Sequence, residues 1–267
     1  MHCWNHRKSS STSLIQPFFH PQPTTCMNFC RKHSSYQGAA KIQAEVASWT
    51  AESLALIPDL PGPVLELGAG TGFFTQYLAQ KFPEVAASDL SNAMIEEAKQ
   101  EVPSVSWQVL DAWNLPDSPK WSGLFSTSLL QWCSDPEQTF PHWHHLLLPE
   151  GWMLHSCFTE GTLQELQHIA PECLAVSFRS SEQWVQHFEK SGFEVLQMET
   201  REDLFHYPNA LAFFRNLHDL GATTPNKISH SKLRSILHQY DTAYSSSDGV
   251  PAHWNSTKFL CRKRLES

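Results

Sequence analysis

The sequence has no long hydrophobic run. None of its apolar stretches approaches the roughly 20 residues that a membrane-spanning helix needs, so we expect a soluble protein of the cytoplasm. Basic residues are also few, since 19 lysines and arginines stand against 27 acidic residues and give a formal net charge of -8. General nucleic-acid binding normally needs a strongly basic face. We therefore expect neither a nucleic-acid partner nor a membrane partner.

Paired cysteines are absent as well. The seven cysteines are scattered, and none forms a C-x-x-C pair, which argues against a zinc site and a disulfide framework and favours a reducing compartment. His142 and His145 stand three residues apart in an expected helix, without a carboxylate motif. This spacing favours a solvated helix face over a metal site. We expect no bound metal.

Acidic residues are missing from the start of the chain, where the first is Glu45. Residues 1–28 are rich in Ser, Thr, Pro and His, show little periodicity and are expected to be disordered. Arg7 and Lys8 in an acid-free, Ser-rich segment are typical of an organelle transit leader. The alternative is an extension upstream of Met27, which would then be the working initiator. Residues 29–267 are expected to form one domain.

The last glycine of a dinucleotide fingerprint is missing too. A G-x-G-x-x-G motif would require glycine at Phe73, but the glycines that follow the apolar run 64–67 are Gly68, Gly70 and Gly72. Glycines allow positive φ and the close approach of a ligand to the backbone, before a helix expected to begin near Thr71. Glu66 would repel a phosphate but attract the ammonium of an amino acid. The pattern therefore favours S-adenosylmethionine over NAD.

Two acids follow the next two apolar runs. Asp89 ends the run 85–88, where an acid can hydrogen-bond both ribose hydroxyls of a nucleoside. Asp111 follows the run 106–110, where the adenine edge is expected. The predicted cofactor-binding residues are Glu66, Gly68, Ala69, Gly70, Gly72, Asp89, Leu90, Asp111, Ala112 and Ser128.

Apolar runs alternate with helical patterns along the chain, which predicts a parallel sheet covered on both faces. The expected strands are 64–67, 85–88, 106–110, 124–128, 152–158, 193–200 and 257–262. Between the last two runs, residues 207–240 carry two helical patterns, 210–220 and 231–240. A further helix, 181–191, is expected with Ser181 as its N-cap. The predicted fold is α/β: a three-layer, doubly wound, Rossmann-like arrangement with a mostly parallel seven-stranded sheet and a helical insertion before the last strand.

With these motifs placed, the chain from about Phe29 to its end resembles the class I S-adenosylmethionine-dependent methyltransferases. A narrower resemblance is carried by Phe29, Arg31, Tyr36, Ala40 and Gln43, the stretches LQWC at 130–133, EGTL at 160–163 and EL at 165–166, Arg215, Leu217, and GAT at 221–223. In these residues the chain is similar to the malonyl-acyl-carrier-protein O-methyltransferases of biotin synthesis. The chain departs from the family pattern at His218, where a lysine is frequent, and in residues 1–28, which have no counterpart.

The resemblance implies methyl transfer from S-adenosylmethionine to the free carboxylate of malonyl-acyl-carrier protein, or of malonyl-coenzyme A, giving an ester that primes pimelate synthesis for biotin. A malonyl carboxylate, with a pKa of about 3.9, is ionised at neutral pH and needs no general base. The predicted catalytic residues are Tyr36, Gln131 and Arg215. Arg215 is expected to hold the acceptor carboxylate by paired hydrogen bonds, with Arg179 as the alternative.

The resemblance also implies an acidic carrier as partner. The basic residues expected to complement an acidic carrier surface are Lys227, Lys232 and Arg234 and those of the terminal segment 262–264. We expect a monomer. Three other functions remain open: a carboxyl methyltransferase of the trans-aconitate type, a quinone-ring carbon methyltransferase, which would need a base, and a non-catalytic S-adenosylmethionine-binding partner protein.

Overall fold

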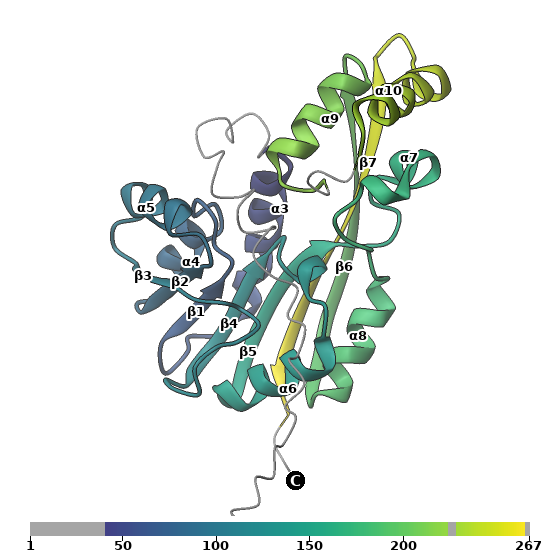
Figure 1. Cartoon of the computed structure of the whole chain (residues 1–267). Helices are drawn as coiled ribbons and strands as arrows, with labels where there is room; N and C mark the ends of the chain where they lie inside the picture. The colour runs from purple at the N-terminus through teal and green to yellow at the C-terminus, as the bar shows by residue number, and fades with distance from the viewer. Residues whose placement is uncertain (1–40, 224–227, 265–267) are drawn as a thin grey trace, which may run out of the picture.

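The computed structural model of the chain describes residues 41–223 and 228–264. The leader 1–28 and the predicted catalytic residue Tyr36 lie outside these residues. A seven-stranded sheet in the order β3-β2-β1-β4-β5-β7-β6 forms the centre of the molecule (Figure 1). The strands are β1 Val64–Leu67, β2 Val85–Asp89, β3 Ser106–Val109, β4 Trp121–Thr127, β5 Leu147–Phe158, β6 Phe193–Tyr207 and β7 Val250–Lys263.

Strand direction divides this sheet into two parts. Strands β1 to β5 are parallel to one another, whereas β7 is antiparallel to both β5 and β6. The expected α/β fold with a mostly parallel seven-stranded sheet is confirmed. The helices are α3 Lys41–Glu52, α4 Thr75–Lys81, α5 Asn92–Glu101, α6 Pro136–Leu146, α7 Gln164–Ile169, α8 Ser181–Lys190, α9 Ala210–Asp219 and α10 His230–Tyr244, with short 3₁₀ turns η2 Ser53–Leu56, η3 Leu130–Trp132 and η4 Pro171–Cys173.

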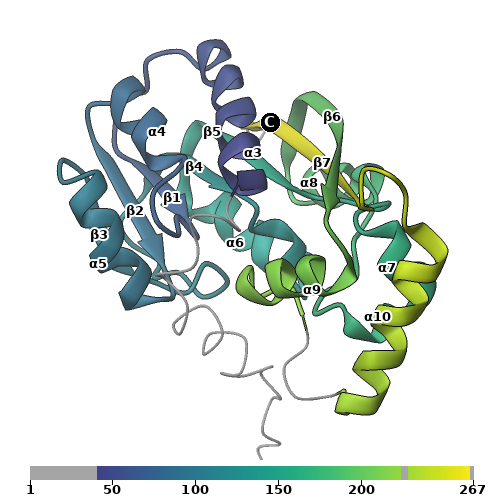
Figure 2. The same cartoon turned by 90° about the horizontal axis from the view of Figure 1, so that it is seen from above.

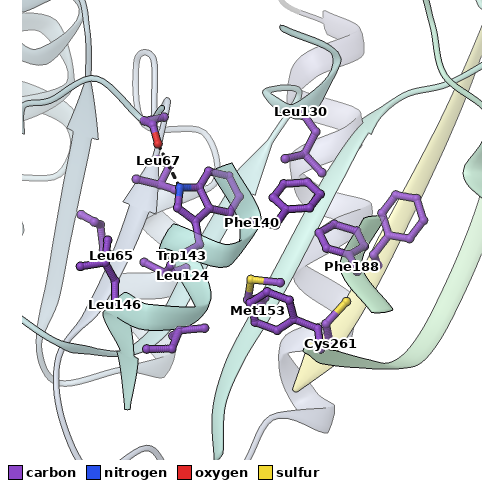
Figure 3. Close-up of a cluster of buried hydrophobic side chains, with 14 of the residues drawn as sticks. Leu65, Leu67, Leu124, Leu130, Phe140, Trp143, Leu146, Met153, Phe188 and Cys261 are labelled. Atoms are coloured by element: carbon purple, nitrogen blue, oxygen red, sulfur yellow. Dashed lines mark hydrogen bonds between the residues drawn. The ribbon is translucent and has the colours of Figure 1, made fainter. Parts of the chain in front are cut away.

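Each face of the sheet is covered by its own apolar cluster. On one face, Ala47 of α3 and Leu78 of α4 pack with Val64 and Phe125. On the other face, the packed side chains are Leu65, Leu67, Leu124 and Met153 of the sheet with Phe140, Trp143 and Phe188 of α6 and α8 (Figure 3). Trp184 of α8 belongs to the same cluster. Because successive strand residues point to opposite faces, the nearly unbroken apolar run of β1 supplies both clusters.

Local caps set where several helices begin. Ser91 accepts a hydrogen bond from the backbone N–H of Met94 and so caps α5. The predicted cap of α8, Ser181, is wrong by one residue. Ser180 is the N-cap, and its hydroxyl and the Gln183 side chain form a reciprocal capping box. The Ser181 hydroxyl instead hydrogen-bonds that of Thr257 on β7 at 2.7 Å.

Several element boundaries differ from the expected ones. The helix after the glycines begins at Thr75 rather than near Thr71, because three residues with positive φ occupy the turn before it. Strands β6 and β7 run well beyond the predicted 193–200 and 257–262. Their added residues pair with each other as far as Tyr207 and Val250, and a pairing partner of that kind is not visible in either segment alone.

The long β6–β7 hairpin determines where the insertion lies. Because β6 runs parallel to β5, its last residue Tyr207 is at the edge of the sheet where the parallel strands end. Helices α9 and α10 follow from there and gather with α7 at that end of the molecule (Figures 1 and 2). The Phe213 and Tyr240 rings, 5.1 Å apart, join α9 to α10.

No helix within the described ranges is both long and apolar enough to cross a bilayer.

Candidate functional site

The carboxyl ends of four neighbouring strands meet at one edge of the sheet. The backbone N–H of Leu110, after β3, donates to the carbonyl of Asp89 at the end of β2 at 3.2 Å. Ala69, in the turn after β1, donates to the carbonyl of Ser88 at 2.9 Å. Leu129, after β4, packs against Gly68. This continuous set of contacts brings the segments that carry the predicted cofactor-binding residues to one edge, where open α/β sheets bind ligands.

The three glycines of the turn have different physical roles. Their φ values are 63°, 56° and 91° for Gly68, Gly70 and Gly72. A Cβ on Gly68 would stand 2.7 Å from Leu129 Cδ1, and one on Gly72 would touch Trp107 at 3.5 Å. A Cβ on Gly70 would meet no atom of the described residues within 4 Å. Packing within the protein therefore requires a glycine at Gly68, whereas Gly72 has room for a Cβ at ordinary contact distance and Gly70 borders open space.

Asp89 holds this turn in place. Its Oδ2 accepts a hydrogen bond from the backbone N–H of Gly70 at 2.9 Å, and its Oδ1 accepts one from Ser91 at 2.8 Å. Burial raises the pKa of the Asp89 carboxyl above its ordinary value, and the backbone hydrogen bonds from Ser91, Gly70 and Leu90 oppose that shift. The ligand contact expected of Asp89 stays a prediction, and the structure shows that this residue fixes the backbone of Gly70.

Glu66 is buried within the sheet itself, with 1% of its surface exposed. It lies on the face of Val64 and Phe125, which α4 covers. Burial raises the pKa of Glu66 to about 8; the Thr75 hydroxyl opposes this shift and the charge of Asp89 adds to it. The carboxyl is thus mostly protonated at neutral pH unless a positive charge comes close.

The turn after β4 contains two further buried polar groups. Ser128 has a φ of 52°, a backbone conformation that non-glycine residues rarely adopt and that is frequent at functional sites. The Gln131 side chain is 7% exposed and donates from Nε2 to the Ser128 carbonyl at 2.7 Å. In the described part of the chain, Ser128 Oγ, Gln131 Oε1 and Glu66 Oε2 are buried without a hydrogen-bond partner. Such atoms are costly unless a ligand satisfies them.

The remaining predicted cofactor-binding residues follow β2 and β3. Asp111 is half-buried, and its Oδ1 accepts a hydrogen bond from the backbone N–H of Trp113 at 3.0 Å. The carbonyl of Ala112 accepts one from the indole of Trp143 at 3.0 Å, the dashed contact of Figure 3. Leu90 is 52% exposed, which leaves a large apolar side chain in solvent next to Asp89.

The predicted acceptor arginine, Arg215, lies on the exposed side of α9. The residues of α9 that are buried are Ala210, Phe213, Phe214 and Leu217, so Arg215 projects away from the core of the insertion. The insertion stands at the same edge of the sheet as the glycine turn. No interaction joins Arg215 to Gln131 among the described residues, so its role stays a prediction.

Arg179 lies next to the β4 turn, from a segment far away in the sequence. Its Nη1 donates to the carbonyl of Cys133 at 2.8 Å, and its Nη2 reaches that of Ser134 at 3.4 Å. The guanidinium also stacks over the Trp184 ring at 5.0 Å. The sequence suggested Arg179 only as an alternative carboxylate ligand, and its contact with this turn was missed because nothing local to either segment signals it.

Comparison with known proteins identifies the family. The profile of a family described as a methyltransferase domain matches residues 39–198, more than half of the chain. The chain belongs to the methyltransferase family. It is similar to a malonyl-[acyl-carrier protein] O-methyltransferase from Priestia megaterium, at 31% identity over 226 residues that cover 75% of this chain and 82% of that protein.

Two other proteins extend this comparison. A biotin biosynthesis bifunctional protein from Teredinibacter turnerae is 25% identical over 264 residues, which cover 90% of this chain but only 46% of that longer protein. The methyltransferase also shares its fold with phosphoethanolamine N-methyltransferase 2 from Haemonchus contortus, solved with S-adenosylhomocysteine, at a TM-score of 0.54 and 17% identity over 91% of this chain and 58% of that chain. The enzyme is an S-adenosylmethionine-dependent methyltransferase.

The residues at the carboxyl edge fit this donor. The methyltransferase has open space at Gly70 and, near the carboxyl ends of β1 and β4, acceptor atoms on Glu66 and Gln131 that have no partner among the described residues. Carboxylate and amide oxygens are suitable acceptors for the ammonium of the donor's methionine part. No cluster of three or more metal-ligating side chains occurs in residues 41–223 and 228–264.

Proposed function

We propose that the enzyme transfers a methyl group from S-adenosylmethionine to the free carboxylate of malonyl-acyl-carrier protein. The observation that carries this proposal is the 31% identity to a relative of that name, over most of both chains. The ester would mask a charge that enzymes with apolar pockets exclude, so that the chain can be elongated toward pimelate for biotin. The biotin-synthesis relative supports this placement.

In this proposal the residues of the carboxyl edge hold the donor. The backbone at Gly70 would lie against it, the carboxylate of Asp89 would accept from its ribose hydroxyls, and Asp111 and Ala112 would lie along its adenine. Glu66 and Gln131 would accept from its ammonium, which would lower the pKa of Glu66 because an opposite charge favours the ionised form. The bound donor supplies an electrophilic methyl group on a sulfonium.

The acceptor needs orientation rather than activation. A malonyl carboxylate is already ionised at neutral pH, with a pKa of about 3.9, so no side chain has to remove a proton. Methyl transfer requires the attacking oxygen, the carbon and the sulfur to lie near one line. We assign this positioning to Gln131 and Arg215, with Tyr36 as a third residue. A paired hydrogen bond from Arg215 would hold the carboxylate by the geometry that guanidinium groups favour.

The direct test is incubation of the full chain with methyl-labelled donor and malonyl-acyl-carrier protein. The proposal expects label in an ester on the malonyl group, with malonyl-coenzyme A as the second acceptor to compare. Label in free acids such as trans-aconitate, and none in the malonyl thioesters, would instead place the enzyme among small-molecule carboxyl methyltransferases.

A test in cells would use a biotin-requiring strain that lacks this step. The full chain and a version that begins at Met27 are both expected to restore growth without biotin, and Arg215→Ala is expected to fail. Growth restored by Arg215→Ala as well as by the parent chain would remove Arg215 from the acceptor site.

A further inference from the structure

Positive charge is concentrated in one segment of this acidic protein. Residues 210–240 contain four basic residues and a single acidic one, together with three histidines. The rest of the chain has fifteen basic and twenty-six acidic residues. The insertion is therefore a basic segment attached to a body that repels anions.

The exposed face of α10 carries much of this charge. Its residues His230, Lys232, Arg234 and His238 are all exposed. The opposite side of the helix is fixed by Ile236 and Tyr240, which are buried in the insertion's core. Lys232 forms an ion pair with Glu172 at 2.7 Å. Within the described ranges no acidic side chain pairs with Arg234, so its guanidinium is available to a partner.

A second basic segment, 262–264, is the alternative docking surface for an acidic partner. The structure places it at the opposite edge of the sheet from the insertion. Arg262 lies opposite Trp152 of β5, at the edge of the sheet where the parallel strands begin, far from the glycine turn along the strands. Its guanidinium pairs with Glu150. Lys263 donates to the carbonyls of His144 at 2.7 Å and Leu147 at 2.8 Å. This segment stabilises the end of α6 and stands at the wrong edge for the site.

We propose that the exposed face of α10, centred on Arg234, is the surface on which an acidic acyl-carrier protein docks. This inference rests on the proposed function, because it assumes a carrier-bound acceptor. The face stands on the insertion at the carboxyl edge, where the donor site lies, so a carrier held there presents its acyl group on the correct side of the sheet. Complementary charge accelerates encounter, and the acidic body disfavours docking elsewhere.

The test compares two charge reversals on two acceptors. Arg234→Glu changes the proposed surface, and Arg264→Glu is its matched control, because Arg264 is also exposed but lies at the opposite edge. The acceptors are malonyl-acyl-carrier protein and malonyl-pantetheine, which carries the same acyl thioester without the protein. Methyl transfer is followed with labelled donor at low and high salt, and thermal unfolding of each variant is recorded.

We expect Arg234→Glu to raise KM for the carrier-bound acceptor about tenfold at low salt and much less at high salt, since screening acts over about 8 Å at physiological ionic strength. Its kinetics on malonyl-pantetheine and those of Arg264→Glu on both acceptors should match the parent chain. Equal KM changes for the two variants on the carrier would overturn the docking surface. An equal loss of methyl-transfer activity on both acceptors in Arg234→Glu would overturn it as well. A parent chain that methylates malonyl-pantetheine but never the carrier would overturn the proposed function itself.

Discussion

The Glu66 carboxyl lies between β1 and α4, and its surroundings link stability to pH. Its pKa is about 8 in the folded chain, whereas an ordinary value of 4.5 applies when the chain unfolds. Between these values the folded state keeps a proton that the unfolded state has released. Raising the pH through this window therefore favours unfolding, by up to about 1.4 kcal/mol per pH unit.

Glu66→Gln should remove this pH dependence, because an amide stays neutral. We expect the thermal midpoint of the variant, relative to the parent chain, to be higher at pH 8 than at pH 5. Affinity for S-adenosylhomocysteine, which retains the ammonium of the donor, should fall about tenfold in calorimetry. Glu189→Gln is the matched control, since Glu189 is exposed on α8. Parallel midpoint curves for Glu66→Gln and the parent chain would contradict the assigned protonation.

Substitutions at Gly70 and Gly72 distinguish an effect on ligand binding from the destabilisation that backbone strain causes. Gly70→Ala places a methyl in the open space at the turn, whereas Gly72→Ala places one at ordinary contact distance from Trp107. Both positions have positive φ, so both variants should lose about 1–2 kcal/mol of stability. We expect only Gly70→Ala to abolish binding of S-adenosylhomocysteine. Equal affinity in the two variants would show that no ligand approaches Gly70.

The turn between β4 and α6 depends on a residue that is distant in sequence. Arg179 donates to the carbonyls of Cys133 and Ser134, just after the Gln131 side chain that lies at the site. A lysine keeps the charge but cannot span two carbonyls with a planar fork. Arg179 thus acts in our interpretation as a positioning residue rather than as the carboxylate ligand considered from the sequence.

Arg179→Lys is therefore expected to raise the dissociation constant of S-adenosylhomocysteine about tenfold and to lower kcat, with little change in KM for the acceptor. Arg179→Met should have the same pattern with larger changes. A rise in acceptor KM alone, with the dissociation constant unchanged, would instead identify Arg179 as a carboxylate ligand. A lower thermal midpoint with unaltered binding and kinetics would restrict it to the packing against Trp184.

Elements set by local signals were predictable, and those set by distant partners were not. The cap at Ser91, the strand 64–67 and the two helical patterns of the insertion depend on neighbours within a few residues. The full length of β6 and β7 depends on their pairing with each other, which extends to Tyr207 and Val250. The same distinction holds at the candidate site. Glycines and acids at strand ends could be placed from the sequence, whereas the contacts of Gly68 with Leu129 and of Arg179 with Cys133 join separate segments.

On the scale of the whole molecule, two buried ionisable groups on different strands have opposite effects on the pH dependence of stability. His155 on β5 is buried beside Trp143 and hydrogen-bonded to Ser126, and burial lowers its pKa from 6.5 to about 3. In the unfolded chain His155 binds a proton below pH 6.5, whereas in the folded chain it stays neutral until the pH is near 3. Stability therefore falls as the pH drops from 6.5 toward 3. Glu66 has the reverse effect, with stability falling as the pH rises from 4.5 toward 8.

These two effects overlap between pH 4.5 and 6.5, where one cancels the other. We expect the thermal midpoint of the ligand-free enzyme to show a plateau in this range, an acid limb due to His155 and an alkaline limb due to Glu66. Asp89, whose pKa is raised above 3.8, acts in the same direction as Glu66, since its contribution makes stability fall as the pH rises from that ordinary value. Thermal unfolding measured across pH 3.5–9 checks this shape.

Binding of the donor should reshape only one limb of that profile. An ammonium beside Glu66 stabilises its carboxylate and lowers the pKa of Glu66, so stability no longer falls at alkaline pH. His155, in the core between α6 and α8, is unaffected. Saturating S-adenosylhomocysteine should therefore raise the midpoint more at pH 8 than at pH 5 and leave the slope of the acid limb unchanged. A uniform rise at all pH values would mean that the bound ammonium does not lie beside Glu66, and the orientation of the donor in this site would have to be reversed.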